Sequence, residues 1–234
     1  MHTLIEDKSF RNKLYVFKDR REAGKLLSQQ LLEHKNTDAI VLGIPSGGVP
    51  VAAEIANALV LPLDLLIVRK VQIPYNTEAG FGAVSPDNMV LLNEKLLGKL
   101  NLSAEEVKRQ IQRTRETIKK RNDLFRKGVP FPSVKNKVAI IVDDGLASGY
   151  TMLSAIAFIK RHKPQKIVVA VPTGSKKTVD DVLSQVDELV CLNVRSGFVF
   201  AVADAYENWY DLDDDEVLSF LKISTNQGQA MTDY

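Results

Sequence analysis

The sequence predicts an α/β protein with a doubly wound, mainly parallel five-stranded sheet flanked by helices. Five short runs rich in valine, isoleucine and leucine are typical of strands buried on both faces of a sheet. Amphipathic segments alternate with these runs, which is the pattern of strand–helix–strand units. In such folds ligands bind beyond the carboxyl ends of the strands, so we expect the functional residues in the loops that follow strands.

The predicted elements follow one another in a regular order. The apolar runs that predict strands are residues 39–44, 63–68, 138–142, 166–171 and 188–192. Apolar residues spaced three and four positions apart predict helices over residues 20–33, 49–59, 151–160 and 176–184. Residues 224–234 are polar, and we expect them to form a flexible tail.

One long helix interrupts this alternation. Residues 103–127 begin with a capping box, in which Ser103 is the N-cap and Glu106 is the N3 residue, and they end before Gly128. A narrow apolar stripe is surrounded by lysines and arginines. We expect a helical insertion that lies solvated across the domain or forms a dimer interface, and RNA or DNA binding is the alternative.

Size and composition fit a single domain over residues 1–234. A chain of 234 residues with 45% hydrophobic residues can bury a core without cross-links. The formal net charge of +2 argues against a strongly polyanion-binding or disordered protein. The single cysteine, Cys191, lies in an apolar run and is expected to be an inert buried thiol. We expect no membrane span and a cytoplasmic location, because no segment approaches the ~20 apolar residues that a span needs.

The loop after the third predicted strand has the features of an anion-binding site. It joins a strand to a helix, and the amides at a helix N-terminus bind a phosphate dianion well. Glycines allow the backbone to turn and to approach a ligand, and hydroxyls add uncharged donors. We therefore expect a sugar 5-phosphate to be bound by residues 145–151, which are Gly145, Leu146, Ala147, Ser148, Gly149, Tyr150 and Thr151.

Two adjacent carboxylates, Asp143 and Asp144, precede this loop. Such a pair can accept hydrogen bonds from vicinal sugar hydroxyls and can hold a hydrated Mg²⁺, mostly through water. Phosphate and diol together indicate ribose 5-phosphate. A P-loop would need Gly-Lys-Ser/Thr, and a dinucleotide fold would need Gly-x-Gly-x-x-Gly after its first strand, and neither occurs here. The structural alternative is an Asp-Asp-Gly turn that only connects strand to helix.

The run Ile-Val-Asp-Asp-Gly-Leu-Ala-Ser-Gly-Tyr-Thr-Met, residues 141–152, resembles the signature of type I phosphoribosyltransferases, strongest over residues 143–151 and within a likeness that covers roughly residues 20–220. Ser148 stands where the family usually has threonine, but the hydroxyl is retained. Ala147 stands where members that act on 6-oxopurines usually carry aspartate, which makes hypoxanthine and guanine poorer candidates. The resemblance implies the substrate phosphoribosyl diphosphate (PRPP), Mg²⁺ as cofactor, and a nitrogenous base or related small molecule as acceptor.

The resemblance also implies a diphosphate-binding loop, which we expect at Ser46, Gly47 and Gly48, with a cis peptide between Pro45 and Ser46. Arg69 and Lys70 follow a predicted strand and resemble the basic pair that stabilises the departing diphosphate. Residues 71–84 and the long helix occupy the stretch where other members carry a mobile lid. Glu78 lines the site or is a surface acid.

A small C-terminal hood that stacks on the base is the last expectation from the resemblance. Its aromatic candidates are Phe198, Phe200, Tyr206 and Trp209, although core packing explains these rings equally well. The family likeness therefore predicts a phosphoribosyltransferase with Asp143, Asp144, Arg69 and Lys70 at the reacting centre, in a homodimer. The alternative is a PRPP-sensing regulator on the same fold that binds nucleic acid.

Overall fold

A computed structural model describes residues 2–74, 76–197 and 199–229, without the side chains of residues 77, 78 and 222–229. Its main sheet has six parallel strands in the order β1-β9-β8-β7-β2-β3. Their bounds are β1 (Thr3–Ile5), β2 (Ile40–Gly43), β3 (Leu63–Leu65), β7 (Val138–Val142), β8 (Lys166–Ser175) and β9 (Glu188–Arg195). The doubly wound parallel sheet is confirmed, but the number of strands is six and not five. The additional strand, β1, is a three-residue edge strand with half-exposed side chains, so it lacks the apolar run that marks the others.

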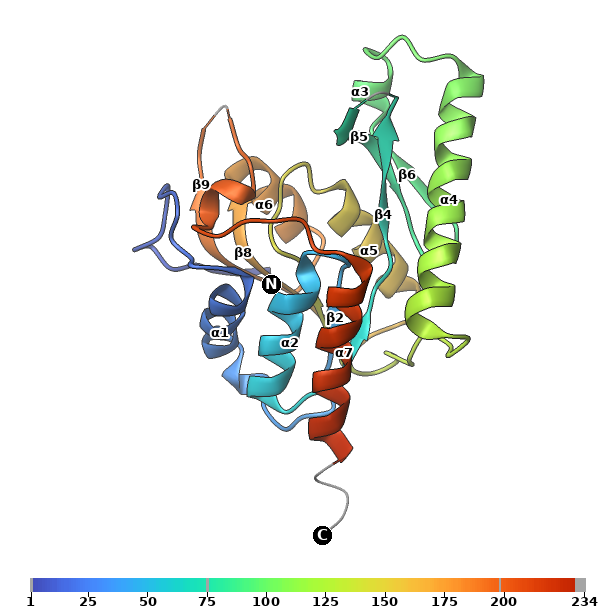
Figure 1. The fold of residues 1–234 in the computed structure, drawn as a ribbon. Helices are drawn as coiled ribbons and strands as arrows, with labels where there is room; N and C mark the ends of the chain where they lie inside the picture. The colour runs from blue at the N-terminus through green and yellow to red at the C-terminus, as the bar shows by residue number, and fades with distance from the viewer. Residues whose placement is uncertain (1, 75, 198, 230–234) are drawn as a thin grey trace.

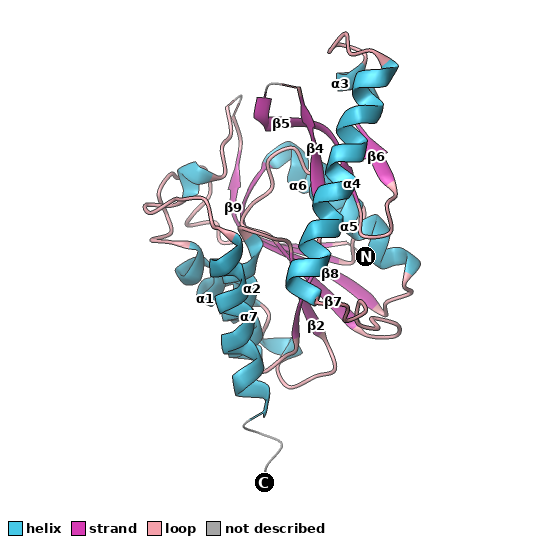
Figure 2. Ribbon diagram, turned by 45° about the vertical axis from the view of Figure 1, so that its right-hand side comes forward, coloured by secondary structure: helices cyan, strands magenta, loops and turns pink. Residues whose placement is uncertain are grey.

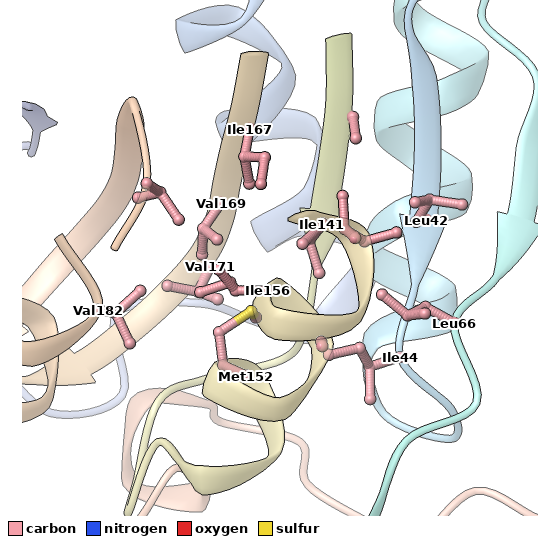
Figure 3. Packing of buried hydrophobic residues seen from close by; sticks show 14 of the residues in the cluster. Leu42, Ile44, Leu66, Ile141, Met152, Ile156, Ile167, Val169, Val171 and Val182 are labelled. Carbon is pink, nitrogen blue, oxygen red and sulfur yellow. The ribbon is translucent and has the colours of Figure 1, made fainter. Parts of the chain in front are cut away.

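Helices cover both faces of this sheet (Figure 1). One face carries α1 (Arg20–Gln30) and α2 (Gly48–Leu59), and the other carries α5 (Tyr150–Arg161) and α6 (Lys176–Leu183). Successive residues of a strand point to opposite faces, so Ile140 packs under α1 and α2 while Ile141 packs under α5. Figure 3 shows the packing on the face covered by α5, where Met152 and Ile156 lie over the strands.

A second, antiparallel sheet stands beside the main one. It consists of β4 (Arg69–Ile73), β5 (Asn76–Val84) and β6 (Val90–Leu92), in the order β4-β5-β6. The short helix α3 (Glu94–Leu97) and the long helix α4 (Ala104–Arg126) accompany it, and α4 runs along the strands in both ribbon views (Figures 1 and 2). Residues 71–84, expected to form part of a lid, are therefore mostly strand. Arg69 and Lys70 begin β4 instead of simply ending the preceding strand.

The boundaries of the helices that the sequence predicts agree closely with the structure, whereas α3 and α7 (Asp214–Gln229) were not predicted. The capping box of α4 is present, with Ser103 Oγ accepting from the Glu106 amide and the Glu106 carboxylate accepting from the Ser103 amide. The expected helix over residues 20–33 divides into α1 and the 3₁₀ turn η1 (Leu32–His34). The expectation of a flexible tail from residue 224 was wrong in part, because α7 continues through Gln229. Its first half packs by Val217 into the cluster that α4 also joins, and that packing stabilises the helix more than its own sequence does.

The order of strands fixes where a ligand can bind. Strand β2 pairs with β3 on one side and with β7 on the other, so the chain leaves β2 and β7 in opposite directions along the sheet. Gly43 pairs with Val142, and the loops that follow these two residues start side by side. This is the topological switch point at which doubly wound sheets bind ligands. Within the described part of the chain, no helix is long and apolar enough to cross a membrane.

Candidate active site

The loops after β2 and β7 border a cavity of about 820 Å³ at the carboxyl edge of the sheet. The chain segments that reach it come from the loops of the main sheet, from the start of α1, from β4, from α4 and from the segment before α7. The structure brings most of the predicted site residues to this one cavity: its lining includes Ser46, Gly47, Arg69, Lys70, Asp143, Asp144, Ala147, Thr151, Phe200 and Trp209.

The predicted phosphate loop turns at Gly149, the N-cap of α5, which has a φ of 78°. A Cβ there would lie 2.6 Å from Thr178 Cγ2, so both the conformation and the space require glycine. The Thr178 hydroxyl donates to the carbonyl of Ala147 and fixes the loop from the side of α6. The amides at the start of α5 lack acceptors within the helix and are available to an anion.

Leu146 has a different role from its neighbours in the loop. Its side chain is buried, its amide donates to the Thr173 carbonyl at 2.9 Å, and its carbonyl accepts from the Ser175 amide. Leu146 therefore attaches the loop to β8 and contributes no free amide to an anion. The buried cysteine, Cys191, lies on the neighbouring strand, and burial raises the pKa of its thiol.

The acid pair is held in a partly desolvated position. The Asp144 amide donates to Asp143 Oδ1 at 2.9 Å, which fixes the two side chains relative to each other. Burial, followed by the charge of Asp144, raises the pKa of Asp143 well above its usual range. Burial also raises the pKa of Asp144, against the opposing effect of Arg20. Two carboxylates in this environment favour a ligand that brings positive charge or hydroxyl donors.

Arg20 is a buried partner of this pair that the sequence analysis missed. Its Nε donates to Asp144 Oδ2 at 2.9 Å, and its Nη1 donates to the Tyr210 carbonyl at 2.8 Å. Its guanidinium carbon lies 3.9 Å from the centroid of the Trp209 ring. The helix dipole disfavours a cation in the first turn of a helix. Arg20 lies in this position, directly after the N-cap Asp19, and this unfavourable placement could have indicated a functional contact.

The loop after β2 lies directly against the acid pair. The peptide between Pro45 and Ser46 is cis, as predicted. A Cβ on Gly47 would lie 1.8 Å from Asp144 Oδ2, which explains why this position is a glycine. The Gly48 amide donates to the Ile44 carbonyl at 3.0 Å and helps to start α2, so the amides of Ser46 and Gly47 are the better anion donors of the predicted three.

Three further cationic side chains line the cavity. Arg69 and Lys70 come from the start of β4, and Arg121 comes from α4. Burial, followed by the charge of Arg121, lowers the pKa of Arg69. Arg121 was missed as a site residue, but its position carried a signal. It lies three residues after the buried Ile118 and four before the buried Phe125, so it interrupts the apolar stripe of the helix.

The predicted hood residues divide between the cavity and the core. Phe200 and Trp209 line the cavity. Tyr206 is 1% exposed, packs on Phe17, and donates its hydroxyl to the Asp144 carbonyl at 2.6 Å, so it supports the acid pair and offers no face to a base. Phe198 lies outside the described residues, and nothing is described of the Glu78 side chain.

Comparison with known proteins identifies the family. A model of the phosphoribosyl transferase domain matches residues 18–207. The chain belongs to the phosphoribosyl transferase domain family. Two relatives from Mycobacterium tuberculosis, of strains CDC 1551 / Oshkosh and H37Rv, are provisionally named phosphoribosyl transferases and are 37% identical over 206 residues. The match covers 88% of this chain but 46% of each relative, so the chain spans about half of their length.

Among solved structures, the phosphoribosyl transferase domain described here is similar to the protein TT1426 of Thermus thermophilus. The TM-score is 0.69 at 34% sequence identity, and the match covers 88% of this chain and 97% of the other. The phosphoribosyl transferase family implies Mg²⁺, and the donor set fits that ion. The Asp143 and Asp144 carboxylates reach the cavity, and Mg²⁺ prefers oxygen ligands with several retained waters. One Asp144 oxygen already accepts from Arg20, so water-mediated binding fits this pair better than direct chelation.

Proposed function

We propose that this domain catalyses Mg²⁺-dependent transfer of ribose 5-phosphate from PRPP to a nitrogen of a base or a related acceptor, with release of diphosphate. The observation that supports it best is that the two loops expected to bind anions both border one cavity together with the acid pair. The distance between a sugar's 5-phosphate and its 1-diphosphate requires such a pair of loops, with the ring between them. Neither loop alone would indicate this substrate.

Each chain segment then has a defined task. The amides and hydroxyls from Gly145 to Thr151, except the Leu146 amide, bind the 5-phosphate. Asp143 and Asp144 accept hydrogen bonds from the ribose hydroxyls. Ser46 and Gly47 bind the diphosphate by their amides. Holding both ends of the donor fixes C1 for attack by the acceptor.

The reaction breaks the bond from C1 to the diphosphate oxygen and forms a bond from C1 to the acceptor nitrogen, and the proton of that nitrogen passes to water. Bond breaking leads, so positive charge develops on the ribose and negative charge on the diphosphate. Bound Mg²⁺ would neutralise part of the diphosphate charge. Arg69 and Lys70 stabilise the same developing charge from the wall of the cavity.

The electrostatics of the cavity favour a bound anion. The Arg69 guanidinium has no hydrogen-bond partner among the residues that the structure describes, and burial lowers its pKa. Arg69 is half-buried, and within the described part of the chain only the charge of Asp214 offsets its loss of hydration, so an anionic ligand at this wall would reduce that desolvation cost. The acceptor would enter beside Phe200 and Trp209, which line the same cavity and offer apolar surface to a base.

The test is diphosphate release from PRPP and Mg²⁺ with a panel of nitrogenous acceptors. We expect release by the parent protein with at least one acceptor, and loss of PRPP binding in calorimetry for the double variant Asp143→Asn with Asp144→Asn. A matched control is Asp180→Asn with Asp181→Asn, an adjacent acid pair that is exposed on α6 and paired with Lys176 and Lys177. The control should behave as the parent.

Two results would contradict the proposal. Unchanged PRPP affinity in the double variant removes the acid pair from the site. PRPP binding without diphosphate release for any acceptor, together with salt-sensitive RNA or DNA binding that PRPP modulates, favours the regulator instead.

A further inference from the structure

We propose that Arg121, delivered by the long helix α4, is a third cationic ligand of the diphosphate, with Asp214 as its counterion in the absence of substrate. This inference rests on the proposed function and adds to it a substrate-binding residue outside the family's signature loops. It also gives the long helix a role in the site in addition to its packing, in which Ile118 and Phe125 join a cluster with Val49 and Leu65 of the main domain.

The contacts of Arg121 place it at the diphosphate loop. Its Nη2 atom donates to Ser46 Oγ at 3.2 Å and to Asp214 Oδ1 at 3.0 Å. Its side chain is 17% exposed and lines the cavity together with Arg69 and Lys70. Residues 46, 121 and 214 are far apart in the sequence. They meet because α4 and α7 both pack into the hydrophobic cluster that contains Val49, at the start of α2.

Arg121 differs from the other cations of its helix because it reaches the cavity. Arg115 and Arg126 are also partly buried, but Arg115 donates to the Asn88 carbonyl and Arg126 pairs with Asp64, and neither lines the cavity. Arg109, Arg113, Lys119 and Lys120 are exposed, as expected of a solvated helix surface. Arg121 instead occupies the stripe that carries Ile118 and Phe125, and its guanidinium carbon lies 5.8 Å from the Phe125 ring centroid. An arginine that sits in a buried stripe and points into a polar cavity loses hydration, and it needs a compensating ligand.

The local charge balance is incomplete without such a ligand. Arg121 lies close enough to Arg69 to lower the pKa of that residue, so two guanidinium groups repel each other at one wall. Asp214 is the counterion of Arg121, but it is 43% exposed and belongs to the first turn of α7. A carboxylate there is also stabilised by the helix N-terminus, so it tolerates the departure of Arg121. Diphosphate between Arg69 and Arg121 would neutralise both cations.

Arginine suits this task better than lysine. Its planar guanidinium presents donors in a fixed fork, so one edge can remain on Ser46 while another binds a phosphate oxygen. The rival explanation is structural: the ion pair to Asp214 would only fasten α4 to α7. The two explanations make opposite predictions for Asp214. If the ion pair only joins the two helices, substitution of either residue should weaken binding equally. If Asp214 competes with diphosphate for Arg121, substitution of Asp214 should leave Arg121 free to bind diphosphate.

The experiment measures the binding of inorganic diphosphate with Mg²⁺ and, separately, of ribose 5-phosphate by calorimetry. We expect Arg121→Gln to weaken diphosphate binding at least about tenfold, since it removes charge-assisted hydrogen bonds, and to leave ribose 5-phosphate affinity as in the parent. Arg121→Lys should recover part of the loss. Arg113→Gln removes the same charge from the exposed surface of the same helix and should change neither affinity. Asp214→Asn should bind diphosphate as tightly as the parent or more tightly.

Three outcomes would overturn the inference. Parental diphosphate affinity in Arg121→Gln removes Arg121 from the subsite. Equal weakening of diphosphate binding in Arg121→Gln and Asp214→Asn shows that the ion pair only joins the two helices. Equal weakening of diphosphate and ribose 5-phosphate binding in Arg121→Gln has the same meaning. If Arg121→Gln fails to fold, the double variant Arg121→Gln with Asp214→Asn removes both members of the ion pair, and an unimpaired diphosphate affinity in that variant removes Arg121 from the subsite. A parent protein that binds neither probe would instead contradict the proposed function, so the two failures are distinguishable.

Discussion

The Arg20 guanidinium carbon lies 3.9 Å from the centroid of the Trp209 ring, within the range of a cation–π contact. The same guanidinium holds Asp144 and the Tyr210 carbonyl, so one buried cation connects the acid pair with the C-terminal segment. Two separate parts of the chain therefore depend on Arg20. In this arrangement Trp209 contacts Arg20 and also lines the cavity.

We expect Arg20→Gln to lower PRPP affinity at least about tenfold, because Asp144 loses its charge-assisted hydrogen bond and the neighbouring segment loses its anchor. Arg20→Lys keeps the charge but cannot bond Asp144 and Tyr210 through a fork, so only partial recovery is expected. Arg21→Gln is the control, because Arg21 is 61% exposed and pairs with Glu54 on the surface. Parental PRPP affinity in Arg20→Gln would show that Arg20 only packs.

Asp143→Asn should stabilise the fold at neutral pH. The pKa of Asp143 is raised by burial and by Asp144, so ionisation of Asp143 destabilises the folded state. The asparagine keeps the Oδ1 acceptor of the Asp144 amide and removes the charge. Thermal unfolding should show a higher Tm, by about 2–4 °C for each kcal/mol of relief.

The pH dependence of this effect has a fixed sign. The destabilisation is full above the raised pKa and disappears as the pH falls below the ordinary pKa of an aspartate, where both states bind the proton. The Tm advantage of Asp143→Asn should therefore shrink on acidification. An advantage that stays constant between neutral and strongly acidic pH would assign it to a cause other than ionisation.

Ser148→Asp should abolish ribose 5-phosphate binding, because it places a carboxylate among the amides at the start of α5. Ser148 is exposed, so the change should leave Tm nearly unchanged. Ser148→Asn has the same shape without the charge and should retain most of the binding. Calorimetry measures the affinity of both variants for ribose 5-phosphate. Equal affinities would show that the phosphate does not bind at this loop. A larger residue at Gly149 is a poorer test, because its Cβ would first meet Thr178.

Tyr206→Phe and Trp209→Leu should have different consequences. Tyr206 donates a buried hydrogen bond to the Asp144 carbonyl, so Tyr206→Phe should cost about 1 kcal/mol of unfolding free energy and leave acceptor preference unchanged. Trp209 lines the cavity, so Trp209→Leu should mainly raise the KM for the acceptor and should have a smaller effect on the free energy of unfolding. Denaturant unfolding and steady-state kinetics with one competent acceptor separate the two. A change in acceptor preference in Tyr206→Phe would show that the Tyr206 ring contacts the acceptor, as the predicted hood requires.

The central sheet was predictable because its strands are buried on both faces, so each carries a continuous apolar run. The elements that the sequence analysis missed have weaker signals. β1 is short and half-exposed, and β5 contains two glycines, at 80 and 82, where a Cβ would meet Lys70 and Leu91. The second half of α7 is polar, and its helical state follows from a first half that packs by Val217.

The sequence by itself determined the two loops of the site, because each consists of consecutive residues whose chemistry is local: a strand end, glycines, hydroxyls and acids before a helix. Tertiary structure alone decided which distant cations reach them. Arg20 and Arg121 lie 124 and 22 residues before Asp144 and Asp143 in the chain, and packing of α1 and α4 brings their charges to the cavity. The residues next to a cation in the sequence rarely indicate its partner, because the energy of an ion pair depends on the distance between the two charges in space.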